Sequence, residues 1–134
     1  MNVSLQQAQV VIAAAQARAR ELGVQAVISV LDAGVHLKAF HRMDGAPLGS
    51  IDVATGKAKT AVLFGCNSED VYEYLKPGAP APGLELSNGG LMPFAGGMSL
   101  RNADGVLIGA IGVSGGAVPQ DRLIAEAGVA ALGA

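Results

Sequence analysis

One apolar segment limits what this chain can fold into. Residues 106–113 read Val-Leu-Ile-Gly-Ala-Ile-Gly-Val, so an extended strand here has no polar side chain on either face. Such a strand is buried on both sides by other layers of structure. We therefore predict a sheet with a central strand at 106–114 and with helices packed on both of its faces.

The remaining strand-forming segments come mostly in pairs. Five segments have β-branched or apolar strand patterns: 24–31, 35–43, 91–94, 95–102 and 106–114. Asp32-Ala33-Gly34 and Ala103-Asp104-Gly105 are short turn sequences, and turns of this length join antiparallel neighbours. Pro93 interrupts the short segment 91–94. The expected class is α+β, with about five mainly antiparallel strands.

Helical periodicity occupies most of the rest of the chain. It covers 5–22, 50–64, 69–75 and 119–132. Ser4 and Gln7 have the spacing of a capping box at the first helix, whose polar side carries Gln9, Gln16 and Arg20. Ser50 and Ser68 are predicted to cap the next two helices. Residues 76–88 contain three prolines and are predicted to form a loop or lid.

Length and charge exclude several classes of protein. At 134 residues the chain is expected to form one domain, 1–134, and its net charge of −2 without a basic block argues against nucleic-acid binding. No apolar run reaches the ~18 residues of a membrane span. Charged residues make up only 15%, which predicts apolar surface and a homo-oligomer. One cysteine, Cys66, and no secretory signal favour a cytoplasmic location.

The most reactive cluster is His41-Arg42-Met43-Asp44, which lies at a predicted strand end before a turn. Strand alternation places His41 and Arg42 on opposite faces. His41 is a candidate metal ligand or catalytic acid–base group, or a histidine with a local hydrogen bond. Asp44 is a second catalytic candidate or a turn carboxylate. Arg42 is a candidate for binding an anionic ligand.

Two polar residues lie on a mostly apolar side of the 50–64 helix. Lys57 either pairs with a ligand carboxylate or extends its amine to water. Thr60, one turn later, either binds the same ligand or bonds back to its own helix. No nucleophile–base pair can be located, because neither Ser50 nor Ser114 has a histidine that the sequence places beside it.

Glycine-rich turns add candidate binding positions. Ser114, Gly115 and Gly116 lead into the last helix, where converging backbone N–H groups could hold a carboxylate or phosphate. Asp121 in the first turn either opposes a second anion or pairs with the helix dipole. Gly89-Gly90 indicates close approach of the backbone to a flat ligand or to another subunit.

Several motifs together carry a family resemblance over nearly the whole chain. They are Val30-Leu31-Asp32-Ala33-Gly34, His36-Leu37, Arg42-Met43-Asp44-Gly45-Ala46, Asp52-Val53-Ala54, Lys57-Ala58, Thr60-Ala61, the run from Ile108 to Gly116, Gln120-Asp121 and Ile124-Ala125. The chain thereby resembles the GlcG/HbpS-like family, which includes the C-terminal domain of PduO-type proteins. The resemblance implies a profilin-like fold, dimers to octamers, and binding or degradation of haem.

Two hypotheses with a ligand site follow, beside a third interpretation as an assembly or chaperone-like subunit that binds no ligand. The first is a small oligomeric protein that binds haem, or another planar or carboxylate-bearing ligand. Lys57 and Arg42 would then meet carboxylates, and His41 or Met43 would approach the metal. The second is a cofactor-free enzyme acting on a small carboxylate or carbonyl metabolite, with His41 or Asp44 moving protons. Both assume that Lys57 and the 41–44 segment converge on one cavity.

Overall fold

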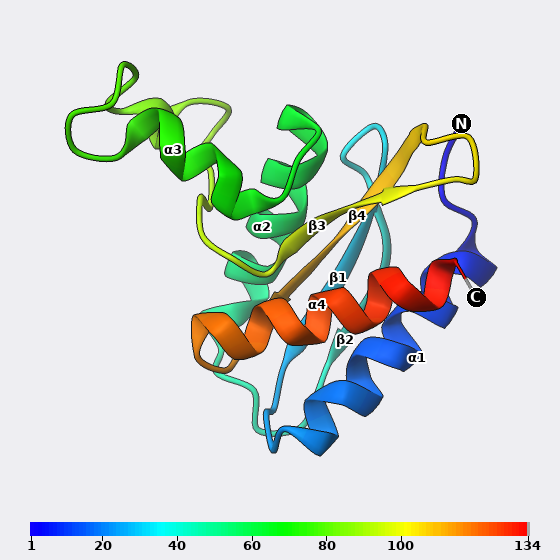
Figure 1. Cartoon of the computed structure of the whole chain (residues 1–134). Helices are drawn as coiled ribbons and strands as arrows, with labels where there is room; N and C mark the ends of the chain where they lie inside the picture. The colour runs from blue at the N-terminus through cyan, green and yellow to red at the C-terminus, as the bar shows by residue number, and fades with distance from the viewer. Residues whose placement is uncertain (134) are drawn as a thin grey trace.

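The computed structural model describes residues 1–133, which form a four-stranded sheet with helices on both faces (Figure 1). The elements follow in the order α1 (Leu5–Glu21), β1 (Val27–Asp32), β2 (Leu37–Arg42), α2 (Ser50–Phe64), η1 (Ser68–Val71), α3 (Tyr72–Leu75), η2 (Leu84–Leu86), β3 (Gly97–Arg101), β4 (Leu107–Ser114) and α4 (Val118–Leu132). The spatial order of the strands is β2-β1-β4-β3, and all neighbours are antiparallel.

The apolar strand β4 lies inside the sheet between β1 and β3, as its sequence predicts. Val27 pairs with Ser114 at one end of β1, and Asp32 pairs with Gly109 at the other. All residues of β4 after Leu107 are buried. By contrast, β2 is an edge strand whose residues are half-buried or exposed.

Helices cover the two faces of the sheet, which confirms the predicted layering (Figure 1). On one face α1 packs against α4, over a core that includes Ile28, Ile111 and Ile124. On the other face α2 crosses the centre of the sheet. Gly112 permits this approach, because a Cβ there would overlap the carbonyl oxygen of Ala54.

Helix α1 begins where the sequence predicts. The Ser4 hydroxyl accepts a hydrogen bond from the backbone N–H of Gln7 at 3.0 Å, and the Gln7 side chain accepts one from the backbone N–H of Ser4 at 2.9 Å. This is the predicted capping box. The buried stripe of α1 includes Ala8, Val11 and Ala15, whose small volumes let the helix lie close to its neighbours.

The strand predicted at 91–94 is wrong, and the sheet has four strands instead of about five. The backbone N–H of Met92 donates to Thr60 Oγ1 on α2 at 2.9 Å, so this segment bonds to a helix and not to a strand. Pro93 removes a further backbone donor that a sheet ladder would need.

Two predicted caps also differ. Ser50 is the first residue of α2, which Gly49 precedes without a side-chain cap. Asn67 precedes η1, and its backbone N–H donates to the Asp70 carboxylate at 3.1 Å. Ser68 therefore lies inside the 3₁₀ turn, and its buried hydroxyl accepts from the backbone N–H of Gly97 at 2.9 Å.

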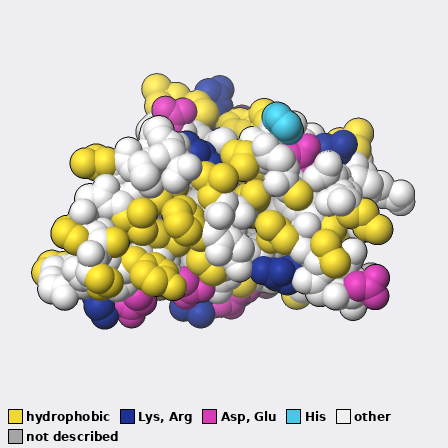
Figure 2. Space-filling view, turned by 90° about the horizontal axis from the view of Figure 1, so that it is seen from above, with side chains coloured by type: hydrophobic (Ala, Val, Ile, Leu, Met, Phe, Trp, Pro, Cys, Tyr) yellow, Lys and Arg dark blue, Asp and Glu magenta, His cyan; other side chains and the backbone are white. Residues whose placement is uncertain are grey.

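Residues 65–96 connect α2 to β3 and extend from one end of the sheet (Figure 1). Hydrophobic side chains gather over the half of the molecule that holds α3 in the view from above (Figure 2). Exposed apolar residues there include Phe64, Tyr72, Tyr74 and Leu86. None of the helices within residues 1–133 combines the length and the apolar character that a membrane crossing needs.

Candidate functional site

A groove of about 410 Å³ lies between α1 and the edge strand β2. We call it the α1–β2 groove; apolar walls and a few polar groups line it, namely Leu5, Gln9, Ile12, Ala13, Gln16, Lys38, Ala39, Phe40 and His41. The helical residues recur at three- and four-residue intervals, so they share one side of α1. Because β2 has no strand on its outer side, the groove stays open to a ligand.

His41 is the residue of this groove with the most versatile chemistry. It pairs with Ile28 across the sheet, which places it on the face that α1 covers. Its Nδ1 lies 3.3 Å from Gln16 Oε1, and Nε2 has no hydrogen-bond partner among residues 1–133. An imidazole oriented through one nitrogen presents the other to a metal or a proton.

A second hollow of about 370 Å³ adjoins the groove at Gln16, which lines both. We call it the arginine hollow; its residues are Gln16, Arg20, Gln25, Arg42, Met43 and Asp44. Three predicted site residues, Arg42, Met43 and Asp44, therefore lie together. The Met43 sulfur accepts from the backbone N–H of Ala26 at 3.4 Å, so it is already engaged within the fold.

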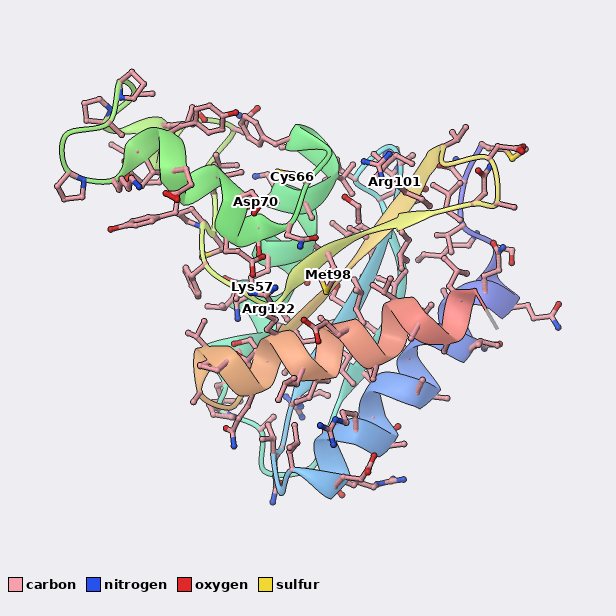
Figure 3. The ribbon with its side chains drawn as sticks, in the orientation of Figure 1. Lys57, Cys66, Asp70, Met98, Arg101 and Arg122 are labelled. Carbon is pink, nitrogen blue, oxygen red and sulfur yellow. The ribbon has the colours of Figure 1, made fainter. Side chains whose placement is uncertain are left out.

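Lys57 lies elsewhere, in the interior between α2 and α4. Its Nζ donates to Asp121 Oδ2 at 3.1 Å and to the carbonyl oxygen of Val113 at 2.8 Å. The two charged side chains are only 1% and 3% exposed. The ring of Phe94 lies 5.0 Å from Nζ and contributes a cation–π contact. Figure 3 labels Lys57 at the end of the molecule where α4 begins.

Two glycines allow the chain to lie close to the side chain and the backbone of Lys57. A Cβ at Gly96 would lie 2.7 Å from Nζ, and a Cβ at Gly97 would overlap the carbonyl group of Lys57. Gly96 also has a positive φ of 129°, which favours glycine. The backbone at Gly96 and Gly97 therefore lies close to Lys57 of the same chain.

Burial shifts both pKa values of the ion pair. Loss of water around the ammonium lowers the pKa of Lys57, although its attraction to Asp121 offsets part of that effect. Burial raises the pKa of the Asp121 carboxyl, although the backbone N–H of Gly116 and the Lys57 charge oppose this. Each group depends on the other for its charged form, and both side chains are almost fully buried.

The glycine turn predicted to hold a ligand carboxylate is filled by the chain itself. The backbone N–H of Gly116 donates to Asp121 Oδ1 at 2.9 Å, and Gly115 contributes a second backbone donor. The anion at this helix start is therefore Asp121. Ser114 is also engaged, because its hydroxyl donates to Ser50 Oγ at 3.1 Å in the interior.

Three further predicted ligand positions have structural partners. Thr60 Oγ1 donates to the Gly56 carbonyl at 2.8 Å and accepts from the backbone N–H of Met92. The first bond is the alternative in which Thr60 bonds back to its own helix. Lys59 Nζ donates to the carbonyl groups of Asn88 and Gly90. These bonds hold the turn that contains Gly89 and Gly90 against α2.

The candidate residues that were expected to share one cavity therefore lie in two separate regions. Arg42 pairs with Val27, which pairs with Ser114, so two strand spacings of about 4.8 Å separate Arg42 from the end of β4. Lys57 is enclosed next to β4, whereas the 41–44 segment faces two open hollows at the edge of the sheet.

Sequence reasoning missed the contribution of α1. It assigned Gln9, Gln16 and Arg20 to the polar side of the helix, but Gln9 and Gln16 line the groove and Arg20 lines the arginine hollow. The spacing of Gln16 and Arg20, four residues apart on one helix side, is the signal that could have indicated this. Within residues 1–133, no group of three or more His, Cys, Asp or Glu side chains is arranged to hold a metal ion.

Comparison with known proteins gives consistent matches along the chain. The sequence profile of the family described as “Haem degrading protein HbpS-like” matches residues 3–130. An uncharacterized 15.0 kDa protein of Citrobacter freundii, encoded in the dhaT-dhaS intergenic region, is 40% identical over 134 residues, which cover 94% of each chain.

Solved structures agree with this match. The crystal structure of Klebsiella pneumoniae protein ORFY superposes with a TM-score of 0.94 at 34% identity, over 98% of this chain and 91% of that one. The crystal structure of a PduOC:haem complex superposes with a TM-score of 0.92 at 37% identity, over 98% of this chain and 95% of that one.

Proposed function

This chain belongs to the HbpS-like family of haem-degrading proteins, and on that basis we propose that it binds haem, or a related planar ligand with carboxylates, in the α1–β2 groove. The observation that carries the proposal is the position of His41. It lies in a partly apolar groove, held by Gln16 through Nδ1, with Nε2 unpaired among the described residues.

The residues of the groove fit the chemistry of haem. Leu5, Ala13 and Phe40 offer apolar surface to a macrocycle. His41 offers an imidazole nitrogen, which is a common axial ligand of haem iron. Lys38 lies in the same lining and offers an ammonium to a carboxylate. Haem brings its own iron, so the site needs no cluster of protein ligands.

Each residue has a defined task in this proposal. His41 would hold the iron through Nε2, and Gln16 would fix the ring orientation by accepting from Nδ1–H. The apolar wall excludes water from one side of the ligand. When bound, haem supplies iron-centred redox chemistry, which the protein side chains do not provide.

Haem titration followed by the Soret band tests the proposal. We expect a saturable shift with the wild-type protein, and an affinity about tenfold weaker with His41→Ala, or about 1.4 kcal/mol. His36→Ala is the matched control, because His36 is the other histidine and its side chain is 82% exposed in the β1–β2 turn. Equal affinities for wild type and His41→Ala would overturn the assignment of the groove.

The cofactor-free enzyme has less support. Lys57, proposed to hold its anionic substrate, is 1% exposed and bonded to Asp121. His41 and Asp44 remain candidates for proton transfer at the two hollows, but no common partner brings them together. A haem-free preparation that turns over a small carboxylate or carbonyl compound would favour this alternative.

We also propose an assembly, a location and a fold type. The exposed side chains of Leu37, Leu48, Tyr74 and Leu86 support a homo-oligomer, from dimer to octamer. A cytoplasmic location and a profilin-like fold stay predictions. Light scattering of the purified chain measures the oligomer directly, and a monomer at micromolar concentration would contradict that part.

A further inference from the structure

The five arginines of the chain divide into two groups. Three have partners within the fold: Arg18 with Glu21, Arg101 with Gly65 and Gly105, and Arg122 with Glu69 and Glu126. Arg20 and Arg42 have no ion pair and no side-chain hydrogen bond with any residue in 1–133. Both line the arginine hollow, so the two unpaired guanidinium groups of the chain share one concave surface.

The hollow neutralises this charge only in part. Asp44 is its one carboxylate, and it lies beyond ion-pair distance of both arginines. Two exposed arginines are well solvated, so they cost the fold little. They do create a positive potential at a concave surface, which attracts anions.

The hollow adjoins the groove in which the ligand is proposed to lie. Gln16 lines both, and Arg20 follows it by one helical turn on the same side of α1. Arg42 follows His41 in β2. His41 and Arg42 point to opposite faces of the strand. Because β2 is the edge strand and Arg42 is exposed, the long Arg42 side chain still lines the hollow.

We infer that the arginine hollow is a carboxylate subsite, which makes the groove selective for planar apolar ligands that carry free acid groups on one side. This inference rests on the proposed function. A guanidinium presents paired N–H donors that match both oxygens of a carboxylate. Two contacts would orient the ligand, because the imidazole would hold its metal and the arginines would hold its acidic edge.

Haem and its dimethyl ester form the decisive pair of probes, since they share ring and iron and differ only in the acid groups. We expect the wild-type protein to prefer haem over the ester by about tenfold, as two exposed charge-assisted contacts allow. The Arg20→Gln/Arg42→Gln variant should bind both with the affinity that the wild type has for the ester. Arg18→Gln, on the same helix and outside the hollow, is the matched control and should keep the preference.

The outcomes separate the two proposals. If neither probe binds saturably, or if His41→Ala binds both as the wild type does, the proposed function fails. If both bind through His41 with equal affinity in the wild type, or if the double variant keeps the preference for haem, the carboxylate subsite is wrong while haem binding stands. A preference that also shrinks at high salt supports the inference, because exposed charges are screened.

Discussion

Lys57 and Arg42 carry the same charge, and sequence reasoning expected them to serve the same ligand, yet the structure treats them in opposite ways. Lys57 is enclosed with a carboxylate, a carbonyl group and an aromatic ring around its ammonium. Arg42 is exposed at the sheet edge, with no partner among residues 1–133. The first holds α2 to α4, and the second is available to bind something from outside.

The comparison shows that the groups around a charged side chain determine its role more than its residue type does. A buried ion pair is costly to assemble, and it is very costly to break, since the remaining charge stays in a medium of low polarity. An exposed cation costs little when it is free. Variants of the two regions should therefore affect different measurements: stability for the buried pair, and ligand affinity for the groove and hollow.

The largest effect is expected at the buried pair. Lys57→Ala and Asp121→Ala should each lower the free energy of unfolding by about 3–5 kcal/mol, because each leaves an unpaired charge in the interior. Urea denaturation followed by circular dichroism measures this. Lys38→Ala is the control, because that lysine lies in the open groove.

A second variant shows whether charge or packing is responsible. Lys57→Met/Asp121→Leu removes both charges and keeps most of the volume, so it should regain most of the stability that either alanine variant loses. Single-variant losses below about 1 kcal/mol would contradict the structural role assigned to the pair.

An intermediate effect is expected at Thr60, which the sequence offered as a ligand residue. Thr60→Val leaves the Met92 N–H without its acceptor, and the free energy of unfolding should fall by about 1–3 kcal/mol. Thr60→Ser keeps the hydroxyl and should lose less. Haem affinity should be the same in both variants. A loss of haem affinity in Thr60→Val alone would show that Thr60 contacts the ligand.

The smallest effect on stability is expected at the open hollows. Arg20→Gln, Arg42→Gln and His41→Ala should each change the free energy of unfolding by no more than about 0.5 kcal/mol, because their side chains have few partners to lose. Thermal unfolding without ligand checks this. A loss comparable to that of Lys57→Ala would show that these residues are structural too.

Much of the fold could be predicted from local patterns. The apolar run at 106–113 identified β4 as a central strand, and Ser4 with Gln7 identified the start of α1. The strand predicted at 91–94 failed because its Met92 N–H bonds to a threonine hydroxyl on α2. No local pattern encodes that contact, since its partners are 32 residues apart.

The site was harder to predict than the fold for the same reason. His41 and Arg42 were recognised as reactive, but which α1 residues face them depends on how the helix packs against the edge strand. Lys57 and Asp121 were both singled out, each as a separate ligand contact. In the structure Lys57 pairs with Asp121, 64 residues away, and not with the carboxylate of a ligand. Only the tertiary structure shows this pairing.

The buried Lys57–Asp121 pair can form only after α4 has been synthesised. Lys57 leaves the ribosome 64 residues before Asp121, so a nascent chain that ends before α4 contains every strand but lacks the carboxylate that hydrogen-bonds this ammonium. That corner must stay hydrated until Asp121 arrives, because an ammonium without a counter-ion resists dehydration. We therefore expect chains that end before α4 to remain open to proteases at a place that is buried in the full-length protein.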